Sequence, residues 1–276
     1  MTIDLDLTPS ATDAAAASSA DAATAAPRER RHAVAGLYNL RDTGGYRAAG
    51  GTSRWGKLLR SDALHRIDAT GRDRLAEIGV AHIIDLRGGD ERATAPSAVD
   101  GLEVTVHHLP VFDDADPAAQ ATTHVGLVPV YDHIVDERGA QLVDAIRVII
   151  AADDDDAVLV HCTAGKDRTG LVVAFALAAA GVDRDDVVAD YAATAENLRG
   201  EWSDAMTAVF EQRGIELTAG MVELITESPA EVLEALLERI DREHGSISAY
   251  LLAHGLTPTE LERLTAVIID PAATAV

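Results

Sequence analysis

The sequence predicts an α/β fold in which a short central sheet is flanked by helices. From about residue 32 onwards, short apolar runs typical of strands alternate with longer segments that have the spacing of helices. In the clearest pair, the run Ala157–Val160 leads through a loop into the apolar segment Thr169–Ala180, which is followed by Gly181, as at the end of a packed helix. Alternation of this kind favours helices on both faces of the sheet.

The elements follow one another along the chain without an internal repeat. Short apolar or β-branched runs predict strands at Lys57–Leu59, His82–Leu86, Val104–Leu109 and Ala157–His161. Helical spacing predicts helices at Asp68–Ile78, Val130–Ala151, Arg168–Ala180, Asp183–Leu198, Ala205–Arg213, Ala230–Glu243 and Pro258–Ile269. Residues 32–276 are expected to form one domain, and a chain of 276 residues can bury one sizeable core or at most two small ones.

Residues 1–31 differ from the rest of the chain. They are rich in Ala, Ser, Thr and Asp without an apolar period, which predicts a disordered acidic tail. No basic region followed by an apolar core is present, so a conventional secretion signal is not expected. No apolar run approaches the length of a membrane span. These features predict a cytoplasmic location by default.

The composition limits the partners. A formal net charge of −23 argues against nucleic acid and anionic membrane surfaces as non-specific partners. The single cysteine excludes an internal disulfide and indicates a reducing compartment or indifference to redox state. The acidic run Asp153–Asp156 lacks the spacing and the glycine of a calcium-binding loop. Neither a metal site nor a cofactor is predicted.

The ten residues His161–Gly170 contain that cysteine and carry most of the functional information. Cys162 stands between a predicted strand and a predicted helix, where backbone N–H groups and the helix dipole favour negative charge. A cysteine in such a place is favoured as the nucleophilic thiolate. Arg168 adds a planar guanidinium that can hold two oxygens of a tetrahedral oxyanion. The loop is therefore predicted to bind an anion beside a thiolate.

The chemistry that fits is in-line attack of sulfur on phosphorus, which gives a phosphocysteine that water then hydrolyses. The loop donors and Arg168 can stabilise the equatorial oxygens, so the reaction needs no metal. The predicted substrate-binding residues are Thr163, Ala164, Gly165, Lys166, Asp167 and Arg168. The predicted catalytic residues in this segment are Cys162, Arg168, Asp167 and Thr169.

The pattern His-Cys-x5-Arg-Thr-Gly resembles the signature of the protein tyrosine phosphatase superfamily. With Ala-Gly-Lys-Asp before the arginine, it is similar to a bacterial branch of tyrosine/serine phosphatases that includes secreted mycobacterial enzymes. Further segments agree with that branch in the same order: Asn39–Tyr46, Leu59–Leu64, Asp85–Arg87, Leu109-Pro110 and Gly245–Leu264. The resemblance covers roughly residues 32 to 270.

The resemblance implies a cysteine-phosphatase-like fold and a phosphatase that acts on phosphotyrosine. It also makes phosphoserine, phosphothreonine and phosphoinositides credible substrates, because lipid phosphatases of the superfamily use a lysine at the position of Lys166 to bind an extra phosphate. Residues 190–244 could form a helical lid over the pocket or a helical insertion at one edge. Secretion by a non-classical route is left open, and the oligomeric state cannot be read from the sequence.

The proton donor to the leaving group has several candidates. Asp113 follows a predicted strand and matches an aspartate that the family places near its site, although Asp114 is an alternative because Phe112 stands where the family has proline. Asp167 lies inside the loop, where its carboxylate could instead hold a neighbouring arginine. Asp132 has a suitable distance in sequence from Cys162 but lies on a predicted helix, and ranks third. We expect Asp113 and Asp167 to share the work.

Supporting roles are predicted for residues around the loop. His161 is expected to orient the loop, and Asp85 and Arg87 to brace it from a neighbouring strand. Arg41 and Asp42 are expected to form a buried structural pair. Thr169 either caps the helix or stabilises the thiolate as leaving group.

Two other function classes remain at this point. One is a phosphate-binding or phosphoprotein-binding module of the same fold with little or no turnover. The other is a different cysteine–oxyanion enzyme, such as a sulfurtransferase or an arsenate reductase, which Arg168-Thr169-Gly170 and the surrounding motifs fit poorly.

Overall fold

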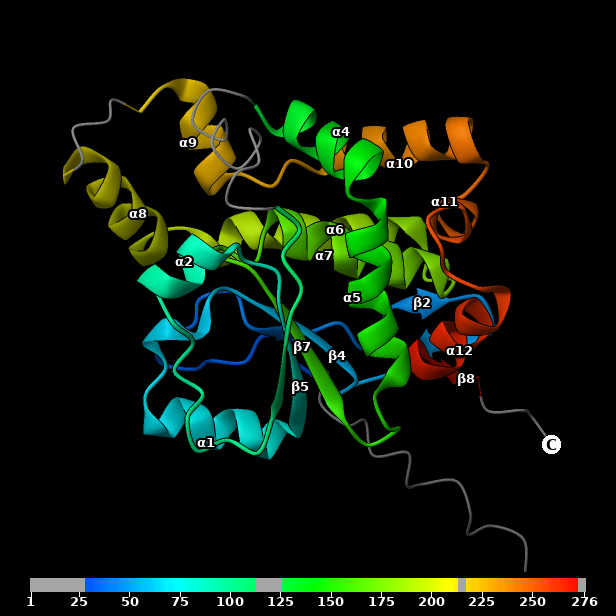
Figure 1. The fold of residues 1–276 in the computed structure, drawn as a ribbon, viewed down its shortest axis with the longest axis horizontal. Coiled ribbons are helices and arrows are strands. Elements are labelled where there is room, and N and C mark those ends of the chain that lie inside the picture. The colour runs from blue at the N-terminus through cyan, green and yellow to red at the C-terminus, as the bar shows by residue number, and fades with distance from the viewer. Residues whose placement is uncertain (1–27, 113–125, 213–216, 273–276) are drawn as a thin grey trace, which may run out of the picture.

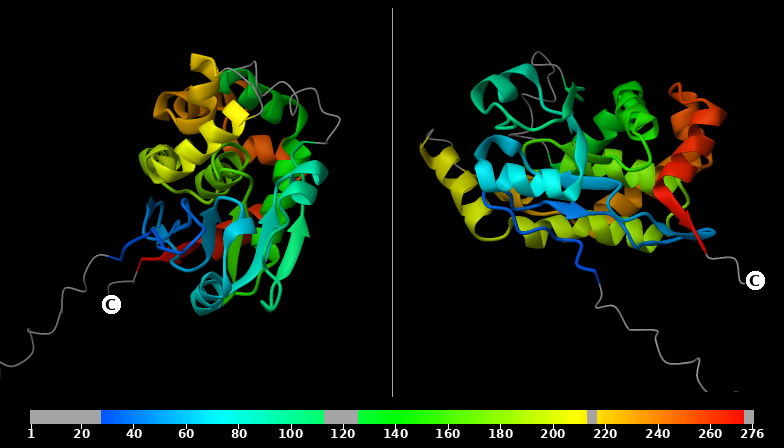
Figure 2. Two further views of the ribbon diagram at one scale, coloured as in Figure 1. Left: turned by 90° about the vertical axis from the view of Figure 1, so that its left-hand side faces the viewer. Right: turned by 90° about the horizontal axis from the view of Figure 1, so that it is seen from below.

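The computed structural model describes residues 28–112, 126–212 and 217–272, which form a sheet covered by helices on both faces (Figures 1 and 2). The five-stranded sheet has the order β1-β4-β7-β5-β6. Its strands are β1 (Arg41–Asp42), β4 (Leu58–Ser61), β5 (Val80–Asp85), β6 (Thr105–His108) and β7 (Ala157–His161). Only β1 runs antiparallel to its neighbour, so the other four strands end at the same edge. The predicted α/β class with a short flanked sheet is confirmed.

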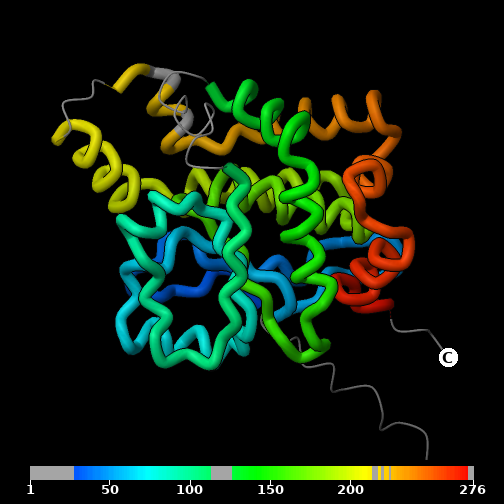
Figure 3. Tube along the Cα trace, viewed as in Figure 1, coloured from blue at the N-terminus to red at the C-terminus, as the bar shows by residue number. Residues whose placement is uncertain are grey.

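A smaller antiparallel sheet joins segments from the two ends of the chain. It contains β2 (Arg47–Ala48), β3 (Gly51–Ser53) and β8 (Ile269–Pro271). The sequence did not predict these strands or β1, because two or three residues are too few to show a period of two. The Cα trace shows how β8 returns the red end of the chain to the blue N-terminal region (Figure 3).

Helices follow most strands. Their bounds are α1 (Ala69–Ile78), α2 (Gly89–Thr94), α4 (Leu127–Glu137), α5 (Gly139–Ala151), α6 (Asp167–Ala179), α7 (Arg184–Leu198), α8 (Glu201–Gln212), α9 (Ala219–Thr226), α10 (Ala230–His244), α11 (Ile247–Ala253) and α12 (Pro258–Ile268). A 3-10 turn spans Leu64–Arg66. No helix of the described residues is long and apolar enough to cross a membrane.

The strand β7 separates two apolar clusters. Side chains alternate along a strand, so Val158 and Val160 face the larger cluster, whereas Ala157 and Leu159 face the smaller one, which also contains Leu75 of α1. All five residues of β7 are buried. The strand that precedes the loop Cys162–Lys166 is therefore held on both faces.

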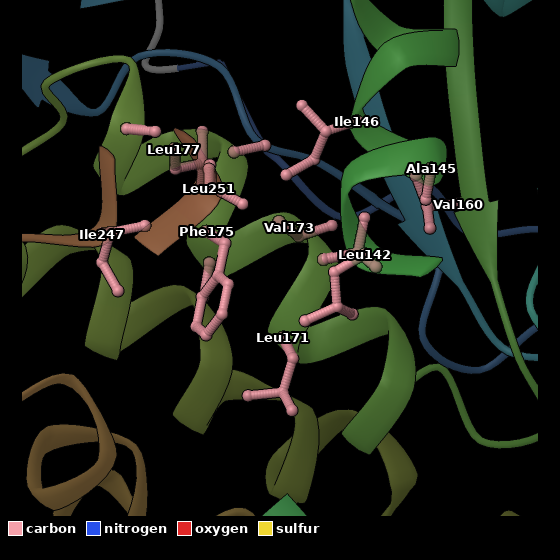
Figure 4. Packing of buried hydrophobic residues seen from close by; sticks show 14 of the residues in the cluster. Leu142, Ala145, Ile146, Val160, Leu171, Val173, Phe175, Leu177, Ile247 and Leu251 are labelled. Atoms are coloured by element: carbon pink, nitrogen blue, oxygen red, sulfur yellow. The ribbon is translucent and has the colours of Figure 1, made fainter. Parts of the chain in front are cut away.

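Helix α6 lies at the centre of the larger cluster. It is apolar nearly all round, with Leu171, Val173, Phe175 and Leu177 fully buried, as in a helix packed on every side (Figure 4). Leu142 and Ile146 of α5 contribute to the same cluster. Both elements that flank the loop are thus fixed by the core.

The predicted helix Val130–Ala151 is instead two helices, α4 and α5, which meet at Arg138 and Gly139. A Cβ atom at Gly139 would lie 2.2 Å from the His254 ring, so a side chain here would collide with the chain ahead of α12. Apolar spacing continues across this break, which is why the sequence indicated one helix.

The predicted tail boundary at residue 31 is also corrected. Arg31 forms an antiparallel bridge with Arg41, and Arg30 Nε donates to the Gly44 carbonyl at 2.9 Å. These contacts place residues 30 and 31 in the folded domain. Residues 1–27 lie outside the described residues.

We expect Leu159→Ala to lower the free energy of unfolding by about 2–5 kcal/mol, because it leaves a cavity in a strand packed on both faces. Urea denaturation measures this change. Val128→Ala, at a position on α4 that is 53% exposed, is the control and should stay within about 0.5 kcal/mol. Equal losses in the two variants would contradict this account of the core.

Candidate active site

The loop Cys162–Lys166 connects β7 to α6 and packs against the end of β4. Gly165 has a φ of +66°, and a Cβ atom there would lie 2.1 Å from the Ser61 carbonyl oxygen. Only glycine combines this left-handed conformation with so close an approach. Cys162 is 2% exposed and lies in the turn that precedes the N-terminus of α6.

The carbonyl groups of the loop face a set of fixed donors. Asn39 Nδ2 donates to the carbonyls of Ala164 and Gly165, each at 3.1 Å. Arg60 Nη2 donates to the Gly165 carbonyl at 2.8 Å. Because the C=O and N–H groups of a peptide point in opposite directions, these bonds direct the N–H groups of Gly165 and Lys166 away from Asn39 and Arg60. Backbone N–H groups directed to one side of a loop are typical of anion-binding sites.

Arg168 is oriented by Glu91 of α2. Its Nη1 donates to Glu91 Oε2 at 2.5 Å, and its Nη2 donates to Oε1 at 2.9 Å. Nη1 also lies 3.5 Å from the Leu86 carbonyl. Within the described part of the chain no hydrogen bond uses Nε, and Nη2 carries a second N–H besides the one that it donates to Glu91. The Nε–Nη2 edge therefore offers two N–H donors to the oxygens of a bound oxyanion.

Glu91 was not predicted as a site residue. Burial raises the pKa of this carboxyl, but the Arg168 guanidinium, the Thr163 hydroxyl and the Gly88 N–H outweigh it and lower the pKa to about 2. Glu91 is thus an anion throughout the neutral range. The sequence does contain a feature that could have revealed Glu91. It stands three residues after Gly88, at the position where a glutamate caps the start of a helix, just beyond the Asp85-Leu86-Arg87 segment.

A buried ion cluster supports the loop from behind. Asp190 of α7 pairs with Arg41 at 3.2 Å and with Arg60 at 2.6 Å, and all three side chains are almost fully buried. Burial, followed by repulsion from Arg60, lowers the pKa of Arg41 to about 10. The same Arg41 donates through Nη1 to the Asn39 carbonyl at 3.2 Å.

The expected pair between Arg41 and Asp42 is not formed. Both residues are buried, but Arg41 pairs with Asp190, whereas Asp42 accepts the N–H groups of Gly44 and Gly56, each at 2.7 Å. Neighbouring residues of a strand point to opposite faces, which explains why they have separate partners.

His161, Asp85 and Arg87 lie at the ends of β7 and β5. Arg87 pairs with Asp85 at 2.7 Å and also reaches the Ala95 carbonyl at 2.8 Å. Burial lowers the pKa of His161 to about 4, so its imidazole is neutral at neutral pH. His161 Nδ1 lies 3.1 Å from the Cys162 carbonyl oxygen, a contact consistent with orienting the loop.

Comparison with known proteins identifies the family of the chain. A model of the tyrosine phosphatase family matches residues 32–270. The chain belongs to the tyrosine phosphatase family. This confirms the resemblance to bacterial tyrosine phosphatases and makes the chain a protein-tyrosine-phosphatase-like hydrolase.

Two relatives and one solved structure illustrate the similarity. The phosphatase is 31% identical over 275 residues to the triple specificity protein phosphatase PtpB of Mycobacterium tuberculosis, covering 85% of this chain and 97% of that protein. It is 33% identical over 158 residues to a tyrosine-protein phosphatase of Nostoc commune, covering 54% of this chain and 51% of that protein. The structure of P. aeruginosa TpbA matches 65% of this chain and 94% of that chain at 19% identity, with a TM-score of 0.36.

The candidate acids of the phosphatase differ in their surroundings. Asp167 begins α6, and its Oδ1 accepts the Tyr131 hydroxyl at 2.8 Å and lies 3.0 Å from Lys166 Nζ. The partners of Oδ1 are thus Tyr131 and Lys166, and not a neighbouring arginine, which was the structural role considered for Asp167 from the sequence. Asp132 pairs with Arg239 of α10 at 2.7 Å, which indicates a role in helix packing. Asp113 and Asp114 lie outside the described residues.

Lys166 and Thr169 are both buried. Lys166 Nζ donates to the carbonyl of Glu227, between α9 and α10, at 2.8 Å. This bond links the loop to the segment predicted as a lid. The Thr169 hydroxyl has no hydrogen-bond partner among the described residues, so it is not used as a helix cap. Among those residues, no group of three or more His, Cys, Asp or Glu could hold a metal ion.

We expect Glu91→Gln to reduce kcat/KM for an aryl phosphate by about 10²-fold, because a neutral amide cannot fix the Arg168 guanidinium in the same way. Steady-state kinetics measure the loss. Glu77→Gln, on the exposed side of α1, removes one carboxylate without touching the loop and is the control. Unchanged kinetics in Glu91→Gln would contradict the positioning role.

His161 gives the stability of the phosphatase a pH dependence. Its pKa of about 4 in the folded chain lies below the ordinary 6.5, so the unfolded chain takes up this proton first. The contribution of neutral His161 to the free energy of unfolding is complete above about pH 6.5. It falls as the pH is lowered towards 4, by up to about 3 kcal/mol in total. Urea denaturation at pH 7.5 and 5 measures the fall. His161→Asn should reduce it, and an undiminished fall in that variant would show that other groups cause it.

Proposed function

We propose that the phosphatase hydrolyses phosphotyrosine through a phosphocysteine at Cys162. The observation that carries the proposal is the guanidinium of Arg168, six residues after Cys162, which Glu91 holds through Nη1 and Nη2 while Nε forms no hydrogen bond in the described part of the chain. This arrangement supplies donors for the equatorial oxygens of a phosphoryl group before the substrate arrives. The preorganised donors lower the barrier without a metal in the step.

In the first step, the sulfur of Cys162 attacks phosphorus, and the P–O bond to the tyrosine oxygen breaks as the S–P bond forms. A carboxylic acid gives its proton to that oxygen. In the second step, a water oxygen attacks phosphorus, the S–P bond breaks, and the carboxylate accepts the proton from water. The free hydroxyl of Thr169 supports a role in stabilising the sulfur as it leaves.

We assign the proton transfer to Asp167, with Asp113 as the other candidate. The support for Asp167 is its place in the loop and the bond from Tyr131, which holds Oδ1 and leaves the second oxygen for the substrate. Tyr131 is itself fixed by a 2.6 Å contact with the hydroxyl of Tyr191.

The substrate range extends, in this proposal, to phosphoserine, phosphothreonine and phosphoinositides. Similarity to a relative named as a triple specificity phosphatase supports the wider range. Lys166 is the residue that would take a second phosphate, because its ammonium carries three N–H donors, of which one goes to the Glu227 carbonyl and one faces Asp167 Oδ1.

Cys162→Ser should abolish turnover of an aryl phosphate in EDTA while keeping substrate binding, because the hydroxyl is a far weaker nucleophile than a thiolate. The Arg168→Lys variant should lose most of its activity, because the ammonium group of lysine cannot replace the planar, bidentate guanidinium of arginine. Burst-phase kinetics and mass spectrometry of the quenched enzyme detect the phosphoenzyme. Turnover by Cys162→Ser would refute the mechanism.

Lys166→Met should reduce turnover of a phosphoinositide bisphosphate at least 10-fold more than turnover of phosphotyrosine peptide. The reason is that only the former brings a second phosphate to the lysine. Phosphate release measured on both substrates gives the ratio. Lys57→Met, which removes another buried lysine far from the loop, is the control. Equal losses on both substrates would exclude a second-phosphate role for Lys166.

A further inference from the structure

A groove outside the catalytic loop is lined by four arginines. It has a volume of about 500 Å³ and lies between α7 and the N-terminal segment, which run side by side in the view from below in Figure 2. Arg30, Arg31, Arg41 and Arg47 contribute to its walls. Such a concentration of cations is unexpected in a chain with a net charge of −23.

Two of these arginines form no ion pair with a described residue. Arg41 is paired with Asp190, and Arg47 lies 3.2 Å from Asp186, a carboxylate that also lines the groove. Arg30 and Arg31 form no ion pair with any residue in the described part of the chain.

Arg30 is nevertheless held in place. Its guanidinium lies 3.9 Å from the centre of the Tyr46 ring, and its Nε donates to the Gly44 carbonyl. Arg31 is restrained less, by a 3.4 Å contact between Nη2 and the Tyr38 carbonyl. Both guanidinium groups therefore keep N–H donors free for a ligand.

The α7 side of the groove is open because its residues are small. Ala189 and Ala193 are both exposed and stand four positions apart, on one face of the helix. Asn197 continues the same row. The volume that longer side chains would fill is left facing the arginines, and its size falls in the range of small-molecule sites.

We propose that this groove binds a small phosphorylated anion through Arg30 and Arg31. A guanidinium matches the geometry of phosphate oxygens, and a doubly charged phosphoryl group neutralises two arginines at once. Cys162 and Arg168 do not line the groove, so the site is separate from the catalytic one.

The groove is one side chain away from the residue that holds the catalytic loop. Asn197 Nδ2 donates to Asn39 Oδ1 at 3.2 Å, and Asn39 in turn donates to the loop carbonyls. An anion in the groove thus lies against the network that positions the loop.

The test is isothermal titration calorimetry of the full-length Arg168→Met variant, which lacks the catalytic anion ligand, with inorganic pyrophosphate. We expect one molar equivalent to bind and the affinity to fall as salt is raised. Adding Arg30→Gln and Arg31→Gln should weaken binding at least 10-fold. Arg263→Gln, which removes an exposed arginine on α12, is the matched control and should leave affinity unchanged.

Because Arg30 packs on Tyr46, a second variant keeps both arginines. Ala193→Glu places a carboxylate in the groove at an exposed helical position and should also weaken binding at least 10-fold. Thr259→Glu, which adds the same charge at an exposed position of α12, should not. Titrations with phenyl phosphate and inorganic pyrophosphate identify, by the tighter affinity, whether the occupant is a phosphate ester or a free phosphate. Absent binding, or binding that neither groove variant weakens, would overturn the proposal.

Discussion

The geometry of the loop that contains Cys162 depends on one buried carboxylate, Asp190. It lies between two buried guanidinium groups, each of which would be costly without an opposite charge. Arg60 holds the Gly165 carbonyl, and Arg41 holds the backbone of Asn39, which also bonds the loop. A charge on α7 therefore sets the direction of peptide groups that follow β7, more than twenty residues earlier in the chain.

The sequence predicted what depends on local pattern. The fold class, β7 and the helix that follows the loop were indicated by apolar runs and are confirmed, whereas the roles of Cys162 and Arg168 stay predictions. The short strands were missed, as was the break at Arg138 and Gly139, where the ring of His254 from a distant segment leaves no room for a side chain at position 139. Contacts between segments that are distant in the sequence cannot be predicted from composition or periodicity.

Partners of charged residues were the hardest to predict. From the sequence we expected Arg41 to pair with its neighbour Asp42, but its partner in the structure is Asp190, which is 149 positions away. Glu91 was missed for the same reason, because its importance comes from facing Arg168 across the site. Which charged residues pair in a site depends on which distant segments meet in the fold. A single sequence shows only which charged residues are present.

The burial of β7 on both faces has a consequence for the loop that follows it. Cys162 follows a strand with no solvent-exposed side, so the backbone that leads into the loop is fixed by side chains of both apolar clusters. Residues of both clusters therefore bear on where the loop begins, although none of those in the smaller cluster belongs to it.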